Sequence, residues 1–127
     1  MSFEVYLLDK KGKPVQVDTH AEGGNIKLDK PFTVGNTVMI GNQDAELNIT
    51  FNYSKYYYQT INSKHGLRYL HHMKARKAIP ILRTAIKKLG TSRTGSYWSA
   101  SPENAGHALA TLLTWAEQYP NATFVVH

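Results

Sequence analysis

Residues 74–89 read KARKAIPILRTAIKKL, and this stretch does most to decide the fold. Its apolar residues recur at helical spacing and make one stripe, while its charged residues fall outside that stripe. Gly90 fits a C-terminal cap, and Pro80 either falls within the first turns or kinks the helix. The stretch therefore predicts a helix with one buried face, formed by Ala75, Ala78, Ile79, Leu82, Ala85, Ile86 and Leu89.

A second helix is predicted to begin at Ser101, which is placed to act as the N-cap. Pro102 takes the first helical position, and Glu103 is favourable beside the positive end of the helix dipole. Gly106 costs about 1 kcal/mol against alanine inside a helix, so it indicates close packing or the approach of a ligand. Pro120 ends the helix, and its predicted buried side comprises Ala105, Ala108, Leu109, Leu112, Leu113 and Ala116.

Strands are predicted on both sides of this helical pair. Residues 45–52 alternate between apolar and polar side chains, as a half-buried strand does. Residues 53–61 suit a helical turn and an extended path equally. The predicted fold class is α+β, a single compact domain with a β-rich N-terminal part, 1–45, and a strand–helix–helix–strand core, 46–127. The other predicted strands are 3–9 and 15–19, which form an N-terminal β-hairpin region, together with 37–40 and 122–127.

Composition places the chain among folded globular proteins. Its 127 residues fit one domain, and 42% of them are hydrophobic. No segment approaches the roughly 20 consecutive apolar residues of a membrane helix. The N-terminus lacks the pattern of a secretory signal, and the absence of cysteine excludes disulfides and thiolate chemistry. We therefore expect a cytoplasmic protein that does not contact a membrane.

The positive charge is concentrated in one block. Residues 47–102 contain no carboxylate, yet they hold ten of the fifteen Lys and Arg residues and eight of the fourteen aromatic residues. The flanking segments 1–46 and 103–127 each carry a net charge of −2, so the total of +6 is a +10 block on a slightly negative scaffold. Cations attract phosphate and aromatic faces stack on bases, so the block predicts a nucleotide-like partner.

Three polar segments are candidates for contacts to a phosphate-bearing small ligand. They are an outward strand row that leads into tyrosines, a glycine-flanked loop with one arginine, and the start of the second helix, where free N–H groups attract anions. A solvent-facing strand, a bare loop and a boundary histidine explain the same residues more simply, and Trp98 more often anchors a core than stacks on a base. The predicted ligand residues are Asn48, Thr50, Asn52, Tyr53, Tyr57, Arg93, Thr94, Ser96, Tyr97, Trp98, Asn104 and His107.

The cations of the first helix offer an alternative site, with Arg76, Arg83 and Lys87 on one flank and Lys77 and Lys88 on the opposite one. A solvated basic face is the usual reason for a short helix rich in Lys and Arg, whereas a contact surface for a phosphate backbone is the more specific one. Under this alternative the nucleic-acid-binding residues are Lys74, Arg76, Lys77, Arg83, Lys87 and Lys88.

Catalysis and metal binding are not expected. The basic block offers no carboxylate to orient His65, His71 or His72 for acid–base chemistry, and no serine-centred nucleophile motif occurs. His71 and His72 are adjacent, so they point apart on a regular helix or strand, and no acidic ligands accompany them. We therefore predict a non-enzymatic binding protein with no cofactor and no metal.

Several strings within residues 46–127 resemble a loose group of small uncharacterised phage and prophage proteins. They are the Asn-x-Thr-x-Asn strand at 48–52, the Ala-Ile-Pro helix at 78–80 and the Asn-Ala-Gly-His helix start at 104–107. The resemblance implies a viral setting, the cytoplasm of an infected bacterial host, where small single-domain proteins often interfere with host defence.

The sequence leaves three functions open. The first is sequestration of a nucleotide-like small molecule, such as a host defence signal, by a homo-oligomer whose pairing closes the pocket. The second is binding of DNA or RNA, or inhibition of a host nuclease complex, through the basic face. The third is docking of that face on an acidic host protein. We favour the first narrowly, because the polar residues are more specific than charge on a helix.

Overall fold

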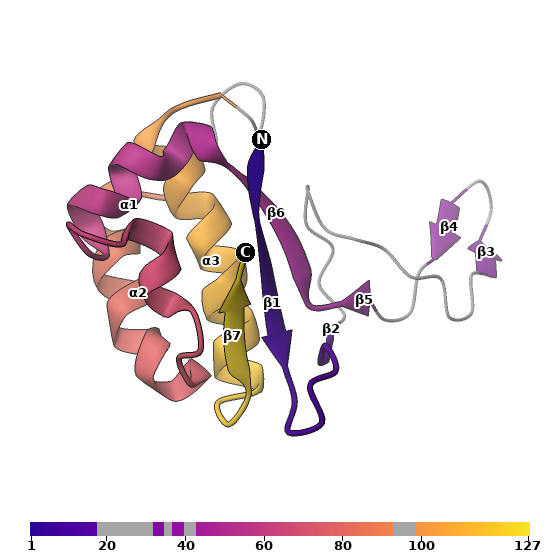
Figure 1. The fold of residues 1–127 in the computed structure, drawn as a ribbon. Coiled ribbons are helices and arrows are strands. Elements are labelled where there is room, and N and C mark those ends of the chain that lie inside the picture. Colours follow the sequence, from indigo (N-terminus) through magenta and orange to yellow (C-terminus); the bar gives the residue numbers. More distant parts are fainter. Residues whose placement is uncertain (18–31, 35–36, 40–42, 93–98) are drawn as a thin grey trace.

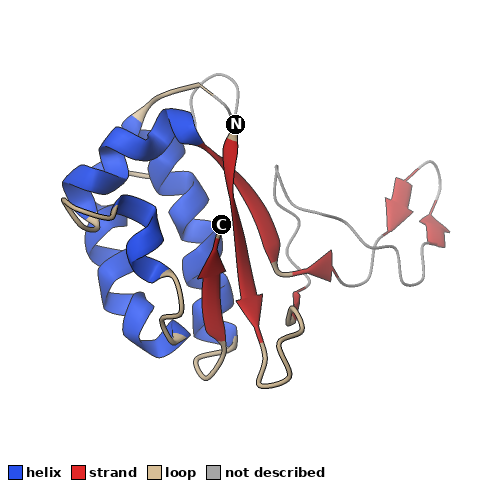
Figure 2. Cartoon of the chain, viewed as in Figure 1, coloured by secondary structure: helices blue, strands red, loops and turns tan. Residues whose placement is uncertain are grey.

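The computed structural model describes residues 1–17, 32–34, 37–39, 43–92 and 99–127. Its main sheet has three antiparallel strands in the order β6–β1–β7, formed by Glu46–Thr50, Ser2–Leu8 and Thr123–Val126. Helices α1 (Ser54–Thr60), α2 (Ala75–Leu89) and α3 (Pro102–Gln118) lie together on one side of this sheet (Figure 1, Figure 2). The prediction of a single compact α+β domain is confirmed.

Shorter elements complete the described part of the chain. Two 3₁₀ helices, η1 (Phe51–Tyr53) and η2 (Gly66–Leu70), flank α1. Strand β2 (Gln16–Val17) pairs with β5 (Gln43–Asp44), and β3 (Phe32–Val34) pairs with β4 (Thr37–Met39). The ambiguous segment 53–61 is therefore mainly helical.

Strand β1 is the centre of the main sheet. Its residue Val5 is paired with Leu47 of β6 on one side and with Val126 of β7 on the other. Phe3, Val5 and Leu7 are buried against the helices, while Glu4 between them is exposed. The boundary predicted at residue 45 does not separate two structural parts, because the N-terminal strand joins the two strands of the 46–127 part.

Strand β6 is shorter than the strand predicted over 45–52. The hydroxyl of Thr50 accepts a hydrogen bond from the Asn52 N–H at 3.2 Å, and this bond begins η1. The alternation of polar and apolar residues continues to Asn52, but the chain is no longer a strand from residue 51 onward.

The two long helices begin and end as the sequence predicts. Gly90 caps α2 with φ 81°, and its N–H donates to the Ile86 carbonyl at 2.7 Å. Ser101 is the N-cap of α3, with its hydroxyl accepting from the Asn104 N–H at 3.1 Å. Pro80 lies inside α2.

Gly106 of α3 lies against Gly90, where an added Cβ would stand 1.8 Å from the Gly90 carbonyl oxygen. The structure thus accounts for Gly106 by close packing.

Candidate functional site

Two of the predicted ligand residues, Tyr53 and Tyr57, lie in the core. Both are 0% exposed, and their rings meet edge to face with centroids 6.3 Å apart. Tyr57 donates its hydroxyl hydrogen to the Ala105 carbonyl oxygen at 3.1 Å. The turn into η1 carries both rings inward, so they join α1 to α3 and are closed to a ligand in this structure.

Two N–H groups at the start of α3 have partners within the chain. The Asn104 N–H donates to the Ser101 hydroxyl, and the Ala105 N–H donates to the Ser101 carbonyl at 3.0 Å. Asn104 is 1% exposed, and its side-chain amide donates to the Ser99 carbonyl at 3.0 Å. His107 is half-buried. These atoms build the helix start, so they are not the free anion donors that the sequence predicted.

The strand row and the loop complete the predicted ligand set. Asn48 is half-buried, Thr50 is buried with its hydroxyl at the start of η1, and Asn52 is exposed. The first and third polar segments do meet, through the bond from Tyr57 to Ala105, but they meet through buried atoms. The loop residues lie outside the described part of the chain; they are Arg93, Thr94, Ser96, Tyr97 and Trp98.

Six exposed cations lie along α2 and at its N-cap. Its buried side faces the core through Ala78, Leu82 and Ala85, among others. By the 3.6-residue period the cations fall on two flanks outside this side, with Arg76, Arg83 and Lys87 on one flank and Lys77 and Lys88 on the other. All of them are exposed, and together we call them the α2 basic face: Lys74, Arg76, Lys77, Arg83, Lys87 and Lys88.

The α2 basic face carries little compensating charge. Arg83 forms an ion pair with Glu117 of α3 at 3.3 Å, and both side chains are about half exposed, at 61% and 49%. An exposed pair of this kind contributes only about 0.2–1 kcal/mol, so it leaves Arg83 free to exchange partners. Within the described residues, Arg83 is the one member of the face that has a carboxylate partner. The positive charge of the face is therefore largely uncompensated by the described residues.

Another cation of the basic block has a structural role. The guanidinium of Arg68 lies over the Phe3 ring at 4.8 Å and near the Phe51 ring at 5.7 Å. These contacts cover the end of the sheet where β1 and β6 meet η1. Arg68 is therefore not counted in the α2 basic face.

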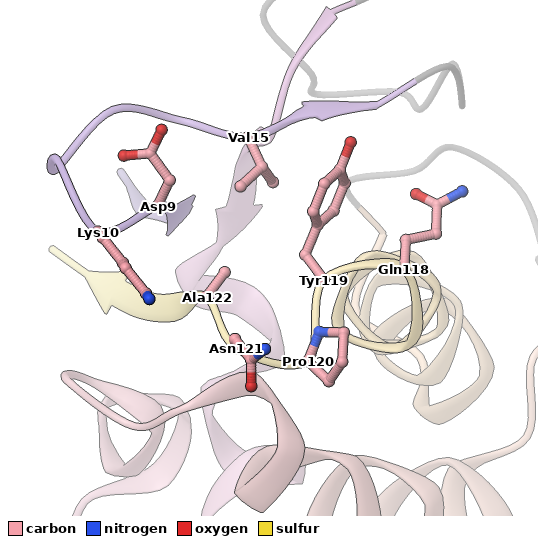
Figure 3. Close-up of a pocket in the computed structure, with 8 residues that line it drawn as sticks. All are labelled: Asp9, Lys10, Val15, Gln118, Tyr119, Pro120, Asn121 and Ala122. Atoms are coloured by element: carbon pink, nitrogen blue, oxygen red, sulfur yellow. The ribbon is translucent and has the colours of Figure 1, made fainter.

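The surface at the start of α2 is hollowed. A hollow of about 450 Å³ is lined by His71, His72, Met73, Lys74 and Lys77. It is larger than a hollow of about 260 Å³ between the turn after β1 and the turn after α3 (Figure 3). That smaller hollow has both Asp9 and Lys10 in its lining, so its charges offset each other. The hollow at the start of α2 is instead lined by two lysines and two imidazoles.

The rings of His71 and His72 lie against each other at a tilt, contrary to the prediction that they point apart. Their ring centroids are 3.7 Å apart with an angle of 30° between the planes. The prediction assumed a regular helix or strand, whereas His72 has φ 65° and turns the chain. The Val126 N–H donates to His71 Nδ1 at 3.0 Å, which fixes the inner ring against β7.

We expect stability to fall as the pH drops through about 6.5, the ordinary pKa of histidine. Burial, aided by His72 and His127, lowers the pKa of His71, so this ring stays neutral in the folded state at a pH where the unfolded chain binds a proton. Between the lowered pKa and 6.5 the unfolded state holds more protons, so the free energy of unfolding decreases as the pH decreases. Thermal unfolding measured at several pH values across this range should show the melting temperature falling as the pH decreases.

His71→Asn is the matched control for that experiment. Its side-chain oxygen can accept from the Val126 N–H but does not titrate, so the pH dependence should become shallower. A profile identical to that of the unchanged protein would show that His71 is not the responsible group.

Other classes of site find no support in the described residues. No cluster of three or more His, Asp or Glu residues there is arranged to hold a metal ion. None of the helices described is both long and apolar enough to cross a bilayer.

Comparisons with models of protein families, with curated proteins and with solved structures find no match to this chain. The resemblance to phage and prophage proteins therefore stays a prediction.

Proposed function

We propose that the protein binds nucleic acid through the α2 basic face, with its cations contacting the phosphate backbone. One observation supports this most: six exposed cations lie along a single helix and at its N-cap, outside its buried side, and within the described residues only Arg83 has a carboxylate partner. A solvated helix of ordinary composition carries both signs of charge on its outer side, so that neighbouring charges stabilise each other. The absence of such mixing on α2 favours an anionic partner.

The length of the face fits several phosphates. From Lys74 to Lys88 the helix rises by about 21 Å, at 1.5 Å per residue. One strand of DNA advances about 3.4 Å per phosphate along its axis, so about six phosphates lie alongside. Contacts to phosphate carry no sequence information, so we expect binding that depends weakly on base sequence.

Capture of a small nucleotide-like ligand by the predicted polar residues has less support. Tyr53, Tyr57 and Asn104 are buried, and the hydroxyl of Thr50 serves the start of η1. The predicted phage setting, interference with host defence, cytoplasmic location and homo-oligomer stay predictions. Docking on an acidic host protein uses the same face, and a nucleic-acid titration separates it from the function proposed here.

We expect the affinity for duplex DNA to fall steeply with salt. If five or six cations each neutralise a phosphate, a plot of log affinity against log salt concentration has a slope of about −4.5 to −5.4. Fluorescence anisotropy of a labelled duplex, measured at several salt concentrations, gives this slope directly. A flat response, or no binding at low salt, would count against the proposal.

A further inference from the structure

The hollow at the start of α2 combines positive charge with a ring that can stack. Its volume of about 450 Å³ is within the range of small-molecule sites, about 300–1,000 Å³. Lys74 and Lys77 are both exposed at its border. None of the described residues that line it is a carboxylate. A phosphate group entering this hollow therefore meets two ammonium groups, and no carboxylate among the described lining residues repels it.

The chain at the hollow is held in an uncommon conformation. His72 has φ 65°, in the left-handed region that residues other than glycine rarely adopt. Its N–H donates to the Phe124 carbonyl at 2.8 Å, and the Phe124 N–H donates to the Met73 carbonyl at 2.9 Å. Such a conformation persists where neighbours fix it, and it is frequent at binding sites. The two bonds to β7 thus fix the backbone at His72, and with it the point from which the ring extends.

The His72 ring is the outer member of the histidine pair. His71 covers one side of it at 3.7 Å and is itself half-buried, whereas His72 is exposed. A planar base can stack on the outer side of this ring, because every nucleobase has an aromatic face. Bases inside a duplex are already stacked on their neighbours, so an unpaired base suits this position best.

We infer that the hollow is a subsite for one nucleotide of a single strand, in which Lys74 and Lys77 bind the phosphate and His72 stacks on the base. This inference rests on the proposed function and adds a preference to it. The α2 basic face binds the backbone of both single-stranded and duplex nucleic acid. The subsite strengthens binding of the single-stranded form only.

The test compares labelled oligothymidine with the duplex that oligothymidine forms with oligoadenosine, at one salt concentration. The unchanged protein should bind the single strand more tightly. His72→Gly removes the ring but accepts φ 65°, so the variant should fold at least as stably as the parent. It should lose about tenfold in affinity for the single strand and nothing for the duplex.

Two further variants locate the effect. Lys74→Gln should make the salt slope shallower by about 0.7 on the single strand and, because Lys74 also belongs to the α2 basic face, by about 0.9 on the duplex. His65→Ala, which removes an exposed histidine outside the hollow, should leave both affinities unchanged.

The results distinguish failure of the subsite from failure of nucleic-acid binding as a whole. If the protein binds neither probe, the proposed function fails, and the subsite fails with it. If it binds both probes equally, or if His72→Gly keeps the single-strand preference, the subsite alone is overturned.

Discussion

Gly106→Ala is expected to destabilise the protein by about 3 kcal/mol or more, as overpacking against a backbone atom does. The new Cβ would lie 1.8 Å from the Gly90 carbonyl oxygen and 3.1 Å from the Leu89 Cβ. A carbonyl at the end of a packed helix cannot turn aside as a flexible side chain can, so α2 and α3 must separate. In an open helix the same change stabilises by about 1 kcal/mol, so even the sign is informative. Chemical denaturation of the two proteins measures the difference.

Gly12→Ala is the matched control for this variant. No atom lies within 4 Å of the Cβ it would add, although Gly12 has φ 76°. Its cost is therefore limited to the left-handed conformation, about 1–2 kcal/mol. If Gly106→Ala proves as stable as the parent, the contact between the end of α2 and α3 is not as described.

Replacing Lys77, Lys87 and Lys88 together with glutamine is expected to weaken duplex binding about a hundredfold or more at about 0.1 M salt. Each lysine lost removes one phosphate contact, so the slope of log affinity against log salt becomes less negative by about 2.7 for the three. Glutamine is close to lysine in helix propensity, so α2 should remain folded. Anisotropy titrations at several salt concentrations give both quantities.

The control for this variant changes three lysines elsewhere. Lys10, Lys11 and Lys13 lie exposed on the turn between β1 and β2, and their replacement with glutamine alters the net charge equally. Affinity should fall far less than in the α2 variant, because the turn is not part of the α2 basic face. Equal losses would mean that net charge, rather than this face, attracts the nucleic acid.

The helices could be predicted because their signals are local. Apolar spacing, the serine cap at Ser101 and the glycine cap at Gly90 all lie within a few residues of the structure they specify. The central position of β1 could not be predicted, because it depends on pairing with residues 40 to 48 and 115 to 121 positions away along the chain. The direction of Tyr57 likewise depends on a hydrogen bond to Ala105, 48 residues away.

In the candidate site, too, local features could be predicted from the sequence and features that depend on distant contacts could not. The exposure of the six cations could be predicted residue by residue, since exposure on a helix follows its period. The tilted contact of His71 with His72 was missed, because it requires the left-handed conformation that β7 imposes on His72. The pair of histidines followed by Lys74 at a helix start was the available signal. The ion pair of Arg83 with Glu117 joins two helices, so no local sequence pattern could predict it.

Mapping of backbone amide NMR shifts tests most directly whether α2 is the surface that meets nucleic acid. Adding short duplex DNA at low salt should shift amide signals along residues 74–88 and leave those of 48–52 and 104–107 in place. Shifts confined to 48–52 and 104–107, or no shifts along α2, would contradict the account.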